Sequence, residues 1–118
     1  MLIVLPETHE ARKQISVLRR ECRLSYRDIS IAAGVSIRAI RNCERYNVLV
    51  AEARVRIDGL YDICKLISTL KPQNRIRIWL RTPQQLFEGK SALKFIQEGK
   101  ASEIKRIIYG MITRRANR

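Results

Sequence analysis

The segment 25–46 constrains the fold most, because one glycine separates two short stretches that are each preceded by a serine. Ser25 precedes the first stretch and Ser36 the second, and a serine hydroxyl can accept a hydrogen bond from the free N–H groups of a helix's first turn. Gly34 lies between them, and glycine readily adopts the left-handed conformation that ends a helix. The segment therefore predicts two short helices, over 26–33 and 37–46, joined by a tight turn.

Apolar side chains elsewhere recur three and four residues apart, which is typical of helices with one buried face. We expect a first helix capped by Thr8, one or two helices over about 51–70 ended by Pro72, a helix broken at Thr82 and Pro83, a short helix capped by Ser91, and a last helix capped by Ser102. Five glycines and three prolines in 118 residues disfavour a turn-rich β fold. The expected fold class is all-α, with a helix-turn-helix bundle over 1–54 and a small helical domain over 55–118. The core is expected to include Trp79, Leu80, Leu86, Phe87, Leu93 and Phe95.

Residues with catalytic or metal-binding chemistry are few. His9 is the only histidine, and Cys22, Cys43 and Cys64 form no Cys-x-x-Cys pair. The sequence therefore predicts buried free thiols, no metal site, no cofactor and no enzymatic activity. The apolar run at 2–5 is stopped by Pro6, and no apolar run is long enough to cross a membrane, so we expect a cytoplasmic protein.

Residues 24–46 resemble the helix-turn-helix of the Xre/Cro-like repressor family. The matching positions are Leu24, Ser25, Ile29, Ala33, Gly34, Val35, Ser36, Ile40, Cys43 and Glu44. Tyr26 and Ser30 depart from the pattern, since the family often has Gln and Ala there. The resemblance implies that the second helix lies in the major groove of DNA, where arginine can bond guanine O6 and N7 together.

With Ile40 and Cys43 inward, the second helix turns its remaining side chains outward, and these include the candidate base readers Arg38, Arg41 and Asn42. Ile37 is expected to contact a thymine methyl group, and the start of the preceding helix is expected to reach phosphates. The predicted DNA contacts are Ser25, Tyr26, Arg27, Ser36, Ile37, Arg38, Arg41, Asn42 and Arg45. A solvated basic face on an ordinary helical bundle is the alternative interpretation.

A second resemblance covers about 55–113. The stretch from Ile78 to Leu93, with Gly99 after it, is similar to the Trp-Leu-x-Thr-Pro … Leu-x-Gly-x-Ser/Thr-Pro-Leu … Gly pattern of the toxin-binding domain in Xre/MbcA/ParS-type antitoxins, and Ala92 replaces its usual proline. The resemblance implies an antitoxin that holds a toxin, often of the RES type. The expected toxin or partner contacts are Arg81, Gln84, Gln85, Lys90, Tyr109, Arg114, Arg115 and Arg118.

The formal net charge is +13, and residues 60–118 hold 13 Lys and Arg against four acidic residues. Such an excess favours an anionic partner. The preferred hypothesis is a homodimeric antitoxin that binds a double-stranded DNA operator, represses its own operon and neutralises a toxin. The alternative is a freestanding phage or chromosomal regulator whose C-terminal half serves dimerisation or extra DNA contacts.

Overall fold

The computed structural model describes residues 10–116, and within them every regular element is helical. The elements are α1 (Ala11–Glu21), α2 (Tyr26–Ala33), α3 (Ile37–Tyr46), α4 (Ala51–Ile67), α5 (Gln73–Arg81), the single-turn 3-10 helix η1 (Gln85–Phe87), α6 (Ala92–Gln97) and α7 (Ala101–Ala116). The expected all-α fold class is confirmed. A single isolated bridge, between Gln84 and Lys90, is the only β pairing in the part of the chain that the structure describes.

The bounds of α2 and α3 agree with the sequence prediction because local caps determine them. The Ser25 hydroxyl accepts from the Asp28 backbone N–H at 3.1 Å, and the Asp28 carboxylate accepts from the Ser25 N–H at 2.9 Å. Gly34 ends α2 at φ +72°, and Ser36 accepts from the Ala39 N–H at the start of α3. Asn47 ends α3 in the left-handed conformation, so each helix begins and ends at a residue whose side chain or backbone suits that position.

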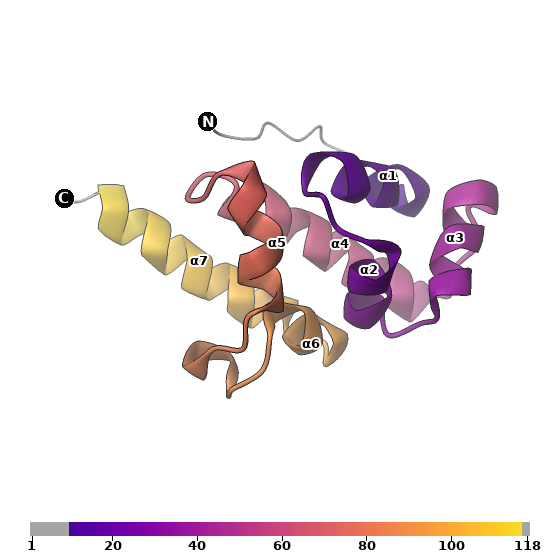
Figure 1. Cartoon of the computed structure of the whole chain (residues 1–118). Helices are drawn as coiled ribbons and strands as arrows, with labels where there is room; N and C mark the ends of the chain where they lie inside the picture. The colour runs from indigo at the N-terminus through magenta and orange to yellow at the C-terminus, as the bar shows by residue number, and fades with distance from the viewer. Residues whose placement is uncertain (1–9, 117–118) are drawn as a thin grey trace.

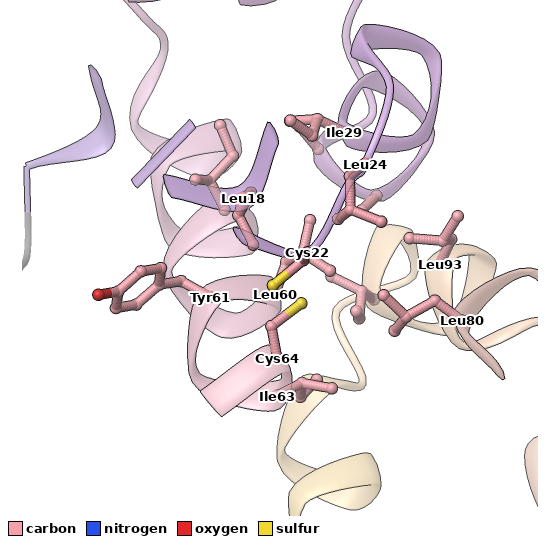
Figure 2. Close-up of a cluster of buried hydrophobic side chains, with 14 of the residues drawn as sticks. Leu18, Cys22, Leu24, Ile29, Leu60, Tyr61, Ile63, Cys64, Leu80 and Leu93 are labelled. Carbon is pink, nitrogen blue, oxygen red and sulfur yellow. The ribbon is translucent and has the colours of Figure 1, made fainter. Parts of the chain in front are cut away.

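The 17-residue helix α4 is the central element, since α1, α2, α6 and α7 all pack against it (Figure 1). One continuous hydrophobic core runs along it from α1 to α7. Figure 2 shows Leu60 and Cys64 of α4 beside Cys22 in the middle of this core, with Leu18 on one side and Leu80 on the other. The expected division between residues 54 and 55 lies within the first turns of this helix, and helices from both parts share its core.

Helices α4 and α7 approach each other closely at one glycine. A Cβ atom added to Gly59 would lie 2.8 Å from the Cβ of Ala101, closer than side-chain carbons normally come. The small residues at both positions therefore let the two helices meet. Gly59 also lies inside a single uninterrupted helix, so the region 51–67 forms one helix and not two.

Two sequence predictions about these elements are wrong. Ser102 does not cap the last helix, because α7 begins at Ala101 and includes Ser102 in its first turn. Leu86 is not a core residue: it is 57% exposed, because η1 is one turn long and directs Phe87 inward, where Phe87 stacks edge-on against Trp79. The predicted cap Thr8 lies outside the described residues, and Glu10 precedes α1 without a side-chain cap bond.

Candidate nucleic-acid interface

Helix α3 has one buried side and one side that no other helix covers. Ile40 and Cys43 are fully buried against α1 and α2, and α3 forms one end of the molecule (Figure 1). The residues predicted to face outward are all exposed: Ile37, Arg38, Arg41, Asn42 and Arg45. Ser36 is also exposed, with its hydroxyl engaged in the helix cap.

Tyr26, at the first position of α2, organises the neighbouring part of this surface. Its hydroxyl donates to the Glu44 carboxylate at 2.5 Å and accepts from the Arg19 guanidinium at 3.0 Å. The guanidinium carbon of Arg41 lies 4.9 Å from the centre of the Tyr26 ring. The hydrogen bond to Glu44 raises the pKa of Tyr26, so the phenol stays protonated. Its hydroxyl is thus occupied within the protein, and the predicted phosphate contact of Tyr26 stays a prediction.

One open depression gathers most of the predicted base readers. It is lined by Tyr26, Arg38, Arg41, Asn42, Glu44 and Arg45. Three guanidinium groups therefore share the depression with a single carboxylate, and that carboxylate already accepts the Tyr26 hydrogen bond. The depression is positively charged. Each guanidinium group is planar and can donate two parallel N–H hydrogen bonds to a pair of neighbouring acceptor atoms.

The residues at the start of α2 that are predicted to contact DNA, Ser25, Tyr26 and Arg27, lie in different surroundings. Ser25 is half-buried and forms the capping box with Asp28, whereas Arg27 is exposed. Arg27 lines a second depression, between α2 and the C-terminal half, together with Asp28, Ile31, Arg81, Ser91 and Leu93. Arg27 therefore lies between α2 and the C-terminal helices and is not among the residues that line the α3 depression.

A pairing that the sequence did not suggest joins α2 to α5. The Arg81 Nε and Nη2 atoms donate to the two carboxylate oxygens of Asp28 at 2.7 and 2.9 Å, and the Asp28 side chain is only 3% exposed. Burial alone would raise the pKa of Asp28, but the hydrogen bonds from Arg81 and Ser25 outweigh it and lower the pKa. Arg81, predicted to contact a partner, is thus held by the protein itself. The two residues are 53 positions apart, and no local pattern links them.

The other residues predicted to contact a toxin do not form one surface. Lys90 is paired with Glu98 at 2.9 Å, while Gln84 and Lys90 are joined by the backbone bridge, and Gln85 is exposed in η1. Arg81, Tyr109 and the pair Arg114 and Arg115 line three different depressions. Arg118 lies outside the described residues.

The three cysteines are buried and free, and Figure 2 shows the sulfur atoms of Cys22 and Cys64 next to each other in the core. Within residues 10–116, no group of three or more His, Cys, Asp or Glu side chains is arranged to hold a metal ion. No helix in that range is long and apolar enough to cross a membrane.

Comparison of the chain with protein-family models, curated proteins and solved structures found no match.

Proposed function

We propose that this protein is a sequence-specific regulator of transcription that binds double-stranded DNA by placing α3 in the major groove. The observation that most supports this proposal is the uncovered side of α3, where Arg38, Arg41 and Arg45 share an open depression with one carboxylate. An α-helix fits the major groove, and a positively charged face is what attraction to phosphates requires. The proposal places the protein in the bacterial cytoplasm, on the nucleoid when it is bound to DNA.

Each exposed residue receives a role from its chemistry. Arg38 and Arg41 are proposed to bond guanine O6 and N7, and Asn42 to bond adenine N6 and N7. Ile37 supplies apolar contact for a thymine methyl group. Arg27 reaches a phosphate from the start of α2, which sets the register of the helix without reading sequence.

The test begins with DNA sites selected by the protein from a random-sequence library. Arg41→Ala is expected to weaken binding to the selected site by about 1–3 kcal/mol and to relax the preference at one base position, because a bidentate base contact is lost. Arg27→Ala is expected to weaken binding to all sequences alike and to flatten the salt dependence. Fluorescence anisotropy titrations measure both. An unchanged affinity and sequence preference for Arg41→Ala would refute the assignment of α3.

We also propose that the C-terminal half holds a cognate toxin, which would make the regulator an antitoxin that represses its own operon. Two large apolar side chains support a protein partner: Ile78 and Leu86 are 59% and 57% exposed, and they lie in the same segment as Arg81, Gln84 and Gln85. Exposed apolar side chains mark an interface where they form one contiguous patch, and the proposal assigns Ile78 and Leu86 to such a patch.

Pull-down of the full-length chain from its host, with and without nuclease treatment, tests the toxin proposal. A stoichiometric partner that survives the nuclease and stops growth when expressed alone supports an antitoxin. Retention of nothing but DNA favours a freestanding regulator. Homodimerisation belongs to the same proposal, since paired half-sites suit a two-fold dimer, and the exposed side chains of Val48, Val50 and Val55 offer apolar area for it.

A further inference from the structure

A compact group of cations lies where the last turn of α7 meets the connection between α4 and α5. Lys71, Arg114 and Arg115 line one open depression there, together with the half-buried side chains of Leu70 and Met111. Arg115 donates to the backbone carbonyls of Thr69 and Leu70 at 3.5 and 3.4 Å, which ties the last turn of α7 to the end of α4. We call Lys71, Arg114 and Arg115 the basic end.

The basic end has no carboxylate to neutralise it. No acidic residue lines the depression, and none lies within ion-pair distance of its three cations in the part of the chain that the structure describes. Three of the four acidic residues of 60–118 are paired elsewhere: Asp62 with Lys105 at 3.2 Å, Glu88 with Lys100 at 3.2 Å and Glu98 with Lys90 at 2.9 Å. Three positive charges are therefore available to an external anion.

The basic end and α3 lie at opposite ends of the molecule (Figure 1), whose longest dimension is 46 Å. Helices α1 and α2 cover the inner side of α3, so its exposed side faces away from the rest of the protein. A straight duplex in contact with α3 therefore does not pass over the basic end. An anion bound at the basic end would therefore belong to a different molecule or to a distant segment of the same DNA.

The composition of the basic end favours nucleic acid over a protein partner. The centre of a protein interface is apolar and holds few charged residues, whereas interfaces with DNA are polar and strongly positive, as a group of three cations without a carboxylate is. Leu70, Lys71 and Met111 are all half-buried, whereas Arg114 and Arg115 are exposed, so the two guanidinium groups are the most exposed part of the basic end. These donors bind phosphate oxygens without reading a sequence.

We propose that the basic end binds the phosphate backbone of a second DNA duplex segment, so that one chain joins two duplexes. This inference rests on the proposed function, in which α3 holds the first duplex. Arg114 and Arg115, which were expected from the sequence to contact a toxin, are assigned to DNA by this proposal. Part of the positive charge excess of residues 60–118 then serves to bind phosphates.

The experiment uses the full-length chain and the double variant K71Q/R114Q. Arg115 is retained because it holds the last turn of α7 in place. The matched control is K94Q/R106Q, which removes the same charge from exposed positions outside the depression. Anisotropy with a random-sequence duplex gives the dependence of affinity on salt. Beads that carry a selected site then report whether bound protein captures a second, labelled random duplex.

The K71Q/R114Q variant is expected to lower the slope of log K against log salt by about 2, since each lost phosphate contact contributes about 0.9. It is also expected to lose capture of the second duplex while its affinity for the selected site stays the same, and the control is expected to behave as the wild type. Equal slopes and equal capture for both double variants would overturn the proposal. So would a K71Q/R114Q variant that keeps the second duplex and loses a bound protein partner instead.

The Arg41→Ala variant separates this proposal from the function of α3. If Arg41→Ala loses the selected site while K71Q/R114Q changes nothing, the basic end fails alone. If K71Q/R114Q loses the second duplex while Arg41→Ala changes nothing, the assignment of α3 fails alone.

Discussion

Tyr26 joins its own helix, α2, to α1 and α3 through two different parts of its side chain. Its hydroxyl bonds Glu44 of α3 and Arg19 of α1, and its ring contacts the guanidinium of Arg19 at 3.9 Å and that of Arg41 at 4.9 Å. The hydrogen bonds fix α3 on the bundle, while the ring restricts where Arg41 can lie. Tyr26 thus contributes to stability through its hydroxyl and its ring contact with Arg19, and to the exposed face of α3 through its ring contact with Arg41.

These two contributions can be separated by substitution. Tyr26→Phe is expected to lower the free energy of unfolding by about 1 kcal/mol, because Glu44 loses a hydrogen bond, and to leave the position of Arg41 unchanged. Tyr26→Leu is expected to weaken DNA binding as well, by about 0.5–1 kcal/mol, because the cation–π contact is lost. Urea unfolding and anisotropy measure the two effects.

Tyr46→Phe is the matched control, because Tyr46 is at the exposed end of α3 and its side chain is 62% exposed. It is expected to change neither quantity. Equal DNA affinity of Tyr26→Phe and Tyr26→Leu would contradict the role given to the ring.

At the scale of elements, the packing of α7 on α4 depends on a glycine that does not end a helix. Gly59 is buried against Ala101, whereas Gly110 in α7 has no atom within 4 Å of the position of an added Cβ. Both glycines are inside helices, so both reduce helix propensity, but only Gly59 is needed for close packing.

Alanine substitution at the two positions should therefore have opposite effects. Gly110→Ala is expected to stabilise the protein by about 0.5–1 kcal/mol, because alanine is the better helix former. Gly59→Ala is expected to destabilise it by about 1 kcal/mol, because overpacking against Ala101 outweighs the same gain. Thermal unfolding of G59A, G110A and the rescue variant G59A/A101G measures this, and a stabilising G59A would show that the contact between α4 and α7 is looser than described.

Prediction from the sequence succeeded at this scale where the determining interactions are local. The bounds of α2 and α3 follow from Ser25, Gly34 and Ser36, whose effects extend over three or four residues. It failed at Ser102 and Leu86, because an isolated serine fits several helix starts and one turn of 3-10 helix can bury either of two neighbouring apolar residues. The outward face of α3 was predicted from the positions of Ile40 and Cys43 alone.

At the scale of the whole molecule, the pair of Asp28 and Arg81 connects the N-terminal helices to the C-terminal ones. It was not predictable from the sequence, because it depends on how α5 packs beside α2, and that packing is determined by the common core around α4. The bonds of Tyr26 to Glu44 and Arg19 have the same origin. Local patterns placed the side chains that we propose to contact DNA on one face of α3, and only tertiary packing showed which side chains are held by neighbours.

The Asp28–Arg81 pair predicts a pH dependence of stability. The pKa of Asp28 is below its unfolded value of 3.8, so its contribution is present well above pH 3.8 and is lost as the pH falls through 3.8 toward the folded-state pKa. Arg81→Gln is expected to lower the free energy of unfolding at neutral pH by about 1–2 kcal/mol, a range that allows for the half-exposed guanidinium. It is also expected to reduce the loss of stability between neutral and acidic pH. Urea unfolding from neutral to acidic pH measures both.

Arg75→Gln provides the control, because Arg75 is exposed on the same helix and makes no ion pair among the described residues. Arg75→Gln is expected to lose as much stability at acidic pH as the wild type does. If Arg81→Gln lost as much as well, Asp28 would not depend on Arg81 for its lowered pKa.

Dimethyl sulfate footprinting of the protein on its selected site tests the placement of α3 most directly, because the reagent methylates guanine N7 in the major groove. The wild-type protein is predicted to protect at least one guanine N7, and Arg41→Ala or Arg38→Ala is predicted to lose protection at that guanine while the complex still forms. A complex in which every guanine N7 stays reactive, or in which both variants keep the full protection, would contradict the insertion of α3 into the major groove.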